Sequence, residues 1–253
     1  MPQFTLVSLP GIPLVQPGDD LARLILDSLH TAELTLRERD ILVVTSKIVS
    51  KAEGRFLDLR TIRPSARAED VAAKTGKDPR LVEVVLAEST SISRMRMGVL
   101  IVRHKLGFTS ANAGIDHSNV GPNGEEWVLL LPVDPDASAA RLRMALHAAT
   151  GVQVGIVIGD THGRPFRLGN VGVAVGVAGL PALLDLRGQP DLFGRVLQAT
   201  DIGLADEIAA AADLLSGQAA EGLPVTLVRG LRFPPADGCA ADLVRPPELD
   251  LYR

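Results

Sequence analysis

Short apolar runs, each followed by polar or glycine-containing residues, alternate along this chain with longer stretches of helical spacing. The apolar runs predict strands at residues 4–7, 40–44, 97–104, 126–133, 152–158, 170–183 and 224–229. Helical spacing predicts helices after Asp20 and at residues 65–76, 78–89, 134–150 and 201–215. Strands that alternate with helices indicate an α/β fold of mixed α+β character, with ligand-binding loops at the strand ends.

Local signals define the ends of these helices and the extent of the folded unit. The expected N-cap residues are Asp78, Asp134 or Asp136, and Thr200 or Asp201. Gly151 is expected to end the helix at 134–150. No internal repeat or linker-like change of composition divides the chain. Residues 1–253 are therefore expected to form one unit, with an irregular tail from about residue 233.

The stretch from residue 152 to 188 combines an apolar run with polar chemistry. VQVGIVI is followed by GDTHGRP, in which a glycine and a proline predict a loop at residues 159–165. This loop would carry the Asp160 carboxylate and the Thr161 hydroxyl beside Arg164 and Arg167, a combination that suits a metal–phosphate site. An ordinary loop in which Asp160 caps a turn explains the same residues. The glycines at 172, 176 and 179 predict a strand packed closely against other backbone.

Two other segments carry candidate ligand-binding residues. The strand at 40–44 ends in TSKIVSK, where Lys47 and Lys51 share one helical face at a spacing of four residues. This pattern is typical of a phosphate-facing turn, although a solvated helix start with two surface lysines is the simpler interpretation. Residues 107–121 form a polar loop that contains Asp116 and Asn119. A turn-rich connector, with these two side chains bonded locally, is the alternative.

Composition excludes several classes of protein. The formal net charge is −4 and aromatic residues make up 3% of the chain, which argues against a nucleic-acid partner. No apolar run reaches the length of a membrane span, and the N-terminal residues do not form a secretory signal. Cys239 is the only cysteine, so an internal disulfide and a cysteine-based zinc site are excluded. A cytoplasmic protein fits best.

Familiar catalytic motifs are absent from the sequence. GxxxxGK[ST], GxGxxG, HExxH and GxSxG do not occur. The remaining candidates are the carboxylates of Asp116 and Asp160, with Thr161, Gln218 and Glu221 as further oxygen donors. Mg²⁺ and Mn²⁺ prefer such oxygen ligands. Two carboxylates far apart in a chain with thirty acidic residues are a weak signal by themselves.

Seven ordered segments add a resemblance to a known family. They are GIPLVQPGDDLA, VVTSKIVSKAEGR, ANAGIDHSN, LLLPVDPDASA, GDTHGRPFRLGNVGVAVGVAG, ADEIAAAADLLSGQAAEG and PVTLVRGL. Together, from about residue 9 to 231, they resemble the coenzyme F-420-0:L-glutamate ligases, which build the γ-glutamyl tail of a deazaflavin coenzyme. Before ANAGID the family usually shows a His-Gly-containing stretch and often a cysteine. Here residues 104–110 read HKLGFTS, a departure in the expected acceptor pocket.

The resemblance implies a GTP-dependent amide ligase of coenzyme F-420 biosynthesis. In the family, GTP phosphorylates the carboxylate of F-420-0, and the amine of L-glutamate then attacks the acyl phosphate, with release of GDP and phosphate. A further γ-linked glutamate can be added. The family uses Mn²⁺ or Mg²⁺, at two sites, responds to K⁺, and forms an interwoven homodimer. The nitroreductase-like domain that is fused to some relatives is not expected here.

The resemblance also assigns roles to individual residues. Asp116, Asp160, Thr161 and Gln218 match metal-ligand positions, and relatives can carry glutamate at the position of Gln218. The positions that match nucleotide contacts are Gly11, Ile12, Pro13, Leu14, Val15, Ser46, Lys47, Lys51, Asn119, Ser216, Gly217, Gln218, Ala219, Ala220, Glu221, Gly222 and Leu223.

Other charged residues next to these positions have weaker assignments. Arg164 and Arg167 are expected to bind anionic substrate groups, because guanidinium groups match phosphate and carboxylate oxygens. His117 directly follows the candidate ligand Asp116, and His162 lies two positions after Asp160. We assign neither as a general base, because neighbouring loop residues often point elsewhere. No catalytic residue is assigned beyond the metal and phosphate ligands.

Two other functions remain open from the sequence. A metal-dependent nucleotide phosphohydrolase would consume GTP without L-glutamate or a deazaflavin acceptor. A non-catalytic nucleotide- or deazaflavin-binding protein would bind without turnover. The seven ordered segments favour the ligase.

Overall fold

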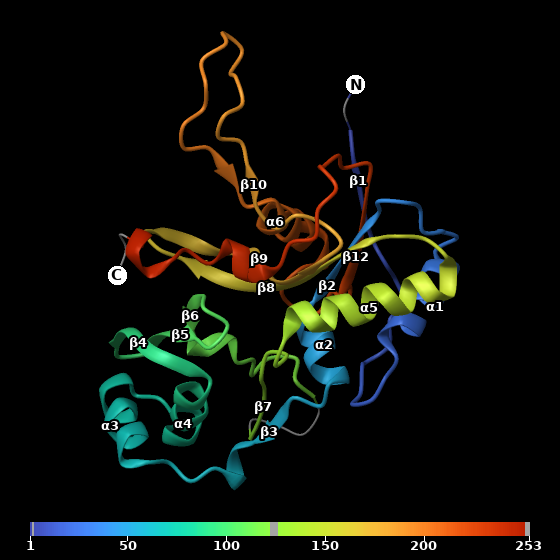
Figure 1. Cartoon of the computed structure of the whole chain (residues 1–253). Helices are drawn as coiled ribbons and strands as arrows, with labels where there is room; N and C mark the ends of the chain where they lie inside the picture. The colour runs from blue at the N-terminus through green and yellow to red at the C-terminus, as the bar shows by residue number, and fades with distance from the viewer. Residues whose placement is uncertain (2, 122–125, 251–253) are drawn as a thin grey trace.

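A five-stranded mixed sheet runs through the centre of the molecule (Figure 1). The computed structural model describes residues 1, 3–121 and 126–250 of the chain. The strand order is β1-β12-β2-β8-β9, in which β2 and β8 are parallel and all other neighbours are antiparallel. The strands are β1 (Thr5–Ser8), β2 (Ile41–Thr45), β8 (Gly155–Arg164), β9 (Arg167–Ala178) and β12 (Val225–Arg229). The mixed α/β architecture expected from the sequence is confirmed.

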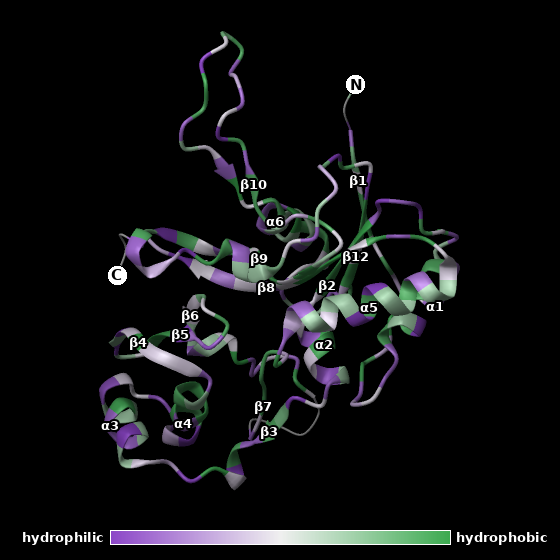
Figure 2. Cartoon of the chain, in the orientation of Figure 1, coloured by the Kyte–Doolittle hydropathy of each residue, from purple (hydrophilic) through white to green (hydrophobic). Residues whose placement is uncertain are grey.

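Helices cover both faces of this sheet. Successive β2 residues point to opposite faces, so Leu42 and Val44 join one apolar core while Ile41 and Val43 join another. Figure 2 shows the hydrophobic colouring of the central strands. The first core includes α1 (Leu21–Thr31), α2 (Ser46–Ala52) and α5 (Pro135–Thr150), and the second includes α6 (Leu204–Ser216).

Two helices begin at the N-cap residues that the sequence predicts. Asp78 accepts a hydrogen bond from the Arg80 backbone N–H, and Asp134 accepts one from Ala137. Gly151 ends α5 in the left-handed conformation. The cap expected at Thr200 or Asp201 is wrong, because Asp201 pairs with Asp185 in a short strand and α6 begins three residues later.

Glycines allow two helices to approach β9 closely, as the sequence predicts. A Cβ atom on Gly172 would lie 2.6 Å from the backbone oxygen of Ala209 in α6. A Cβ on Gly176 would lie 2.5 Å from the backbone oxygen of Pro135 at the start of α5. Both distances are shorter than real Cβ contacts, so only glycine fits at these two positions.

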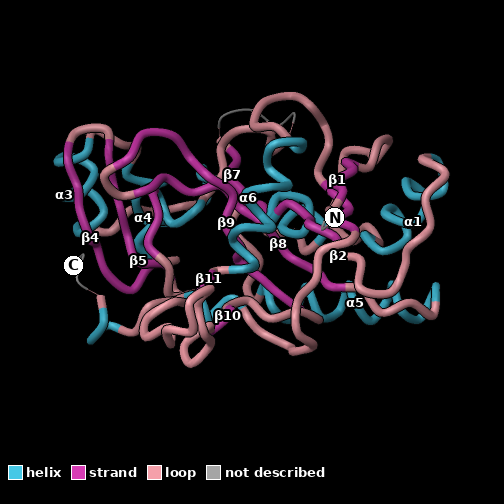
Figure 3. Tube along the Cα trace, turned by 90° about the horizontal axis from the view of Figure 1, so that it is seen from above, coloured by secondary structure: helices cyan, strands magenta, loops and turns pink. Residues whose placement is uncertain are grey.

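A separate apolar core organises the segment between α2 and α5. We call residues 56–121 and 126–130 the small lobe; seen from above, in Figure 3, it lies at the opposite end of the molecule from α1. Its core contains Leu59, Val82, Val85, Leu100 and Val128, all almost fully buried. Its elements are β3 (Phe56–Asp58), α3 (Ala66–Thr75), α4 (Pro79–Ala87), β4 (Ser89–Arg96), β5 (Val99–His104), β6 (Thr109–Ala111), β7 (Trp127–Leu129) and two 3₁₀ turns (Leu59–Thr61 and Asn112–Gly114).

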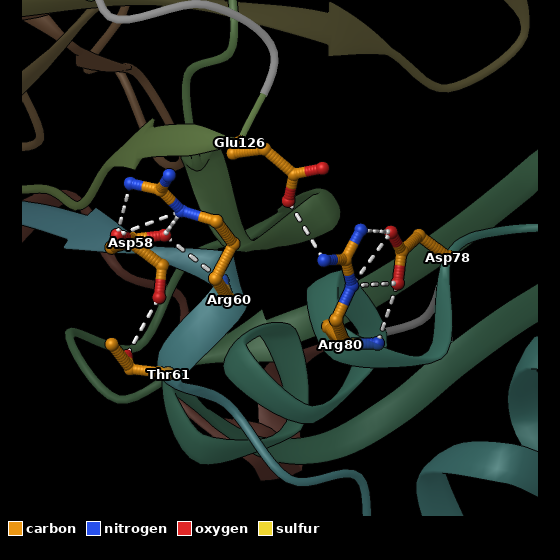
Figure 4. A network of polar contacts seen from close by, with 6 residues as sticks. All are labelled: Asp58, Arg60, Thr61, Asp78, Arg80 and Glu126. Atoms are coloured by element: carbon orange, nitrogen blue, oxygen red, sulfur yellow. Dashed lines mark hydrogen bonds and ion pairs between the residues drawn. The ribbon is translucent and has the colours of Figure 1, made fainter.

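An exposed polar network ties parts of the small lobe together (Figure 4). Arg80 at the start of α4 pairs with Asp78 and also reaches Glu126, with Nη1 2.7 Å from the Glu126 carboxylate. Arg60 pairs with Asp58 at 2.6 Å, and hydrogen bonding to that guanidinium lowers the pKa of Asp58. Because these pairs are at least partly exposed to solvent, each contributes little to the stability of the fold.

The largest departure from the sequence-based expectation is at residues 159–165. The sequence predicts a loop there, but β8 continues to Arg164 and pairs with β9 in a long hairpin. Cross-strand pairing overrides the local turn signal, and the reversal occurs only at Pro165 and Phe166, where Phe166 has a φ of 61°. Asp160 therefore lies on a strand.

The remaining segments are an arm and the C-terminal tail. Between β9 and α6, the chain forms an arm that projects from the body in Figure 1 and is closed at its base by β10 (Leu184–Asp185) and β11 (Asp201–Ile202). The tail is irregular, as expected, apart from 3₁₀ turns at Ala240–Leu243 and Pro247–Leu249. Within the described ranges, no helix is both long and apolar enough to cross a membrane.

Candidate active site

A cavity of about 1090 Å³ lies where the end of the central sheet meets α2, α6 and the small lobe. Besides residues of the central hairpin, β3, β7 and α6, four segments that are distant in the sequence line it. They are residues 12–17 after β1, the start of α2 with Ser46, Lys47 and Lys51, the lobe residues Asp116 and 118–121, and residues 216–224 after α6. Every predicted nucleotide-contacting residue lines this cavity except Gly11, which lies next to it in the chain.

The central hairpin supplies one acidic wall of the cavity. Asp160 and Thr161 on β8 pair with Val173 and Gly172 on β9, and both line the cavity. The Oδ1 atom of Asp160 lies 3.3 Å from the Ser46 hydroxyl, which donates to it from the first turn of α2. The predicted metal ligands Asp160 and Thr161 are thus held by regular strand pairing.

The small lobe supplies the second acidic residue. The backbone of Asp116 is fixed by two 3.0 Å hydrogen bonds with Leu129 at the end of β7. Its carboxylate lies 3.4 Å from the ammonium group of Lys47. Burial raises the pKa of Asp116 to about 6; Lys47 opposes this shift, and the negative charge of Asp160 adds to it. The two carboxylates therefore repel one another across the cavity, and a bound cation would relieve that repulsion.

Lysines of α2 and the Asn119 side chain connect the lobe with the sheet. Lys47 donates to the backbone oxygen of Ser118, and Lys51 donates to that of Asn119, at 2.9 and 2.7 Å. The Asn119 amide donates in turn to the Ala219 backbone oxygen at 2.8 Å. Both burial and the charge of Lys47 lower the pKa of Lys51. Two cations thus lie on one wall of the cavity, where they suit an anionic ligand.

Asp213 is a cavity residue that the sequence analysis missed. It lies one helical turn after Ala209, the residue whose backbone contacts Gly172, and it lines the cavity. The Gln218 amide nitrogen donates to Asp213 at 2.8 Å, so the Gln218 carbonyl oxygen is the atom available as a metal ligand. Burial raises the pKa of Asp213, and the charge of Asp160 contributes. Asp213 follows Ala209 by four residues and so lies on the same face of α6. The sequence could have identified it only if the contact between α6 and Gly172 were already known.

The donor set fits a hard divalent cation. Asp116, Asp160, Thr161 and Gln218 all line the same cavity and present carboxylate, hydroxyl and amide oxygens. Among the residues that the structure describes, no three His, Cys, Asp or Glu side chains cluster closely enough to hold a metal ion by themselves. Neutral oxygen donors, substrate oxygens and water would have to complete the coordination, as is usual for Mg²⁺ at phosphate sites.

Comparison with known proteins identifies the family. The sequence profile described as F-420-0:gamma-glutamyl ligase matches residues 11–230. The chain belongs to this ligase family. It is 47% identical over 252 residues to the coenzyme F-420:L-glutamate ligase of Methanothermobacter thermautotrophicus, with 99% of each chain covered. It is 45% identical over 258 residues to the enzyme of the same name from Methanopyrus kandleri, with 100% of this chain and 99% of that protein covered.

Several candidate residues of this ligase-family chain do not line the cavity. Arg164 lies at the tip of the β8–β9 hairpin, where it donates to the Leu168 backbone oxygen at 2.9 Å. Arg167 is exposed at the same tip. His117 is exposed, and His162 is buried in contact with Asp160 but does not line the cavity. The structure therefore brings the predicted metal and nucleotide residues together but leaves the two arginines outside.

Two aromatic residues at the cavity also escaped the sequence analysis. Phe56 of β3 and Trp127 of β7 come from the paired strands at the base of the small lobe, and both line the cavity. Flat aromatic side chains suit a planar heterocycle, which both a guanine base and a deazaflavin contain. Only strand pairing brings residues 56 and 127 together, so no local signal announced them.

Proposed function

We propose that this protein is a GTP-dependent ligase that adds L-glutamate to coenzyme F-420-0 in the biosynthesis of coenzyme F-420. Membership of the ligase family supports the reaction class. The observation that carries the proposal is the single cavity lined by Lys47, Lys51, Asp116, Asp160 and the loop at residues 216–224. It combines cations suited to phosphate groups with oxygen donors suited to a divalent cation.

The proposed reaction proceeds in two steps. A carboxylate oxygen of the acceptor attacks the γ-phosphorus of GTP, the bond to the bridging oxygen breaks, and GDP leaves. The amine nitrogen of L-glutamate then attacks the acyl carbon and loses a proton, and phosphate leaves with the electrons of the C–O bond. Since the substrate carboxylate is the nucleophile, no protein nucleophile is required. The same steps on a γ-carboxylate would add a further glutamate.

The cavity residues have distinct proposed roles. Lys47 and Lys51 neutralise phosphate charge, and the backbone of residues 12–15 and 216–223 surrounds the nucleotide. Asp116, Asp160, Thr161 and the Gln218 carbonyl would hold Mn²⁺ or Mg²⁺, at two sites. A divalent cation in this position supplies positive charge to the phosphate oxygens. We extend the proposal to stimulation by K⁺, for which we assign no residue, and keep Arg164 and Arg167 as proposed contacts for substrate anions.

We further propose a homodimer, in which apolar side chains of the arm meet the partner chain. Leu192 and Phe193 at the end of the arm are more than 90% exposed, and so is Leu168 on the β8–β9 hairpin. Exposed apolar groups of this size are typical of interaction surfaces. Light scattering should give twice the chain mass for the wild type, and Phe193→Ser should shift the equilibrium toward the monomer. A wild-type monomer at micromolar concentration would contradict the dimer.

The activity is tested by mass spectrometry of the acceptor. Purified protein is incubated with GTP, Mn²⁺, L-glutamate and F-420-0, and GDP is quantified in parallel. We expect the acceptor to gain one or two glutamyl units with matching GDP release. Loss of GTP without a heavier acceptor would instead indicate the phosphohydrolase, and binding without turnover would indicate a non-catalytic protein.

A further inference from the structure

His162 lies behind the predicted metal ligand Asp160 on the same strand. Because β8 is regular between these residues, positions 160 and 162 share one face of the sheet. The His162 Nε2 atom is 3.0 Å from Asp160 Oδ2, and the two side chains are only 10% and 16% exposed. The imidazole thus contacts the carboxylate from the protein interior, not from the cavity.

The two oxygens of Asp160 therefore have different partners. Oδ2 meets His162, while Oδ1 meets the hydroxyl of Ser46, a residue that lines the cavity. A carboxylate that holds a cation is deprotonated and can only accept hydrogen bonds, so His162 Nε2 must be the donor in the state that binds a cation. A nitrogen that donates its proton to Asp160 cannot at the same time accept one from a substrate. The geometry thus excludes Nε2 as a general base.

Residues of the small lobe hold the imidazole in place. The Phe108 ring lies 4.8 Å from the His162 ring at an angle of 45°. Phe108 also stacks on His104, with ring centres 4.9 Å apart and an angle of 5° between the planes. His104 is itself buried, and its Nδ1 accepts a hydrogen bond from the Leu106 backbone N–H. The His162 ring is thereby packed against the turn between β5 and β6.

We propose that His162 is a positioning residue that fixes the Asp160 carboxylate for a divalent cation through its Nε2–H group. This inference rests on the proposed function, because the cation belongs to it. If the carboxylate were free to rotate, ordering it on metal binding would lower the affinity of the site for the cation. A carboxylate that is already hydrogen-bonded is oriented before the cation binds. His162 contacts neither the cavity nor a substrate in this arrangement and so acts only through Asp160.

The test compares two substitutions of His162 by direct Mn²⁺ binding. Free Mn²⁺ is measured by electron paramagnetic resonance during titration of the protein with Mn²⁺ alone. His162→Leu removes the donor, and we expect Mn²⁺ to bind about 10- to 100-fold more weakly. His162→Gln places an amide N–H near the position of Nε2 and should stay within about threefold of the wild type. Equal affinity of the wild type and His162→Leu would overturn the inference.

Two further variants separate positioning from folding. Phe108→Leu weakens the packing of the His162 ring but keeps the Nε2 donor. It should therefore lower the melting temperature and leave the Mn²⁺ affinity close to that of the wild type. In an Asp160→Asn background, His162→Leu should cause no additional loss of Mn²⁺ affinity, since the group through which it acts is gone. Additive losses in that double variant would contradict action through Asp160.

Steady-state kinetics provide a second readout. In His162→Leu the concentration of Mn²⁺ for half-maximal ligase rate should rise about 10-fold or more, while kcat at saturating Mn²⁺ stays within about threefold of the wild type. A fall in kcat that excess Mn²⁺ does not restore would overturn a positioning role. If the wild type binds no Mn²⁺, the metal part of the proposed function fails together with this inference. If the wild type binds and His162→Leu is unchanged, only the inference fails.

Discussion

The two acidic residues that face each other in the cavity are held in different ways. Asp160 belongs to the central sheet, where pairing with β9 and the packing of α6 on Gly172 fix its strand. Asp116 belongs to the small lobe, whose apolar core is separate from both cores of the sheet. The described contacts between the two regions around the cavity are mostly polar and run through Lys47, Lys51 and Asn119. The site is therefore assembled between the sheet and a lobe that contacts it through these polar groups and through the Phe108 ring, which packs on His162.

The largest expected effect comes from removing either carboxylate. Asp160→Asn and Asp116→Asn should each lower kcat/KM for glutamyl transfer by about 1000-fold, because each removes a proposed ligand of the cation that neutralises phosphate charge. The rate is measured as GDP release with matching gain of acceptor mass. Asp27→Asn, an exposed aspartate on α1, serves as the control and should retain full activity. A rate within tenfold of the wild type for Asp116→Asn would show that the lobe does not contribute to the site.

A substitution in the sheet region, at the close contact between β9 and α5, should lower the stability of the fold. Gly176→Ala places a Cβ 2.5 Å from the Pro135 backbone oxygen, and we expect the free energy of unfolding to fall by about 3 kcal/mol, at the upper end for overpacking. Denaturation in urea measures it. Gly163→Ala in the same hairpin has its nearest neighbour at 3.6 Å and should change stability by less than about 0.5 kcal/mol. Equal stability of the two variants would be inconsistent with the tight helix contact.

The small lobe should be sensitive to acid because of His104. Burial lowers the pKa of His104 from 6.5 to about 4. The unfolded chain gains a proton below pH 6.5 that the folded lobe excludes, so stability is lost as the pH falls toward about 4. This contribution amounts to about 1.4 kcal/mol per pH unit, or about 2 kcal/mol at pH 5.

His104→Asn isolates this effect. Asparagine keeps an acceptor for the Leu106 N–H and has no charge at any pH. We expect its unfolding free energy to depend less steeply on pH than that of the wild type between pH 6.5 and 4.5. Urea denaturation at several pH values tests this. Parallel profiles for the two proteins would mean that His104 takes up its proton in the folded state.

The smallest expected effect concerns the polar connection between the regions. Asn119→Gly removes the amide that donates to Ala219, while glycine tolerates the positive φ of 56° at this position. Loss of one hydrogen bond of this kind costs about 1 kcal/mol, which should raise KM for GTP about fivefold. We expect kcat to stay within twofold. An unchanged KM would show that this contact does not hold the two walls of the cavity in place for GTP binding.

Sequence reasoning was most successful where signals were local. The caps at Asp78 and Asp134 and the close approach at Gly172 and Gly176 follow from residue chemistry over a few positions. The shared face of Lys47 and Lys51 follows from helical periodicity, and both lysines do contact one segment, residues 118–119. The loop predicted at 159–165 failed because pairing with β9 offsets the turn tendency of glycine and proline there.

The sequence by itself determined the kinds of element, the buried strands and the chemistry available in each segment, because side-chain periodicity and backbone preferences act over short distances. Only the tertiary structure decided which of those segments meet. It places Asp213, Phe56 and Trp127 at the cavity, Arg164 at the hairpin tip outside the cavity lining, and His162 in contact with Asp160. These placements depend on strand register and on the packing of a separate lobe, and both are set by contacts between residues far apart in the chain.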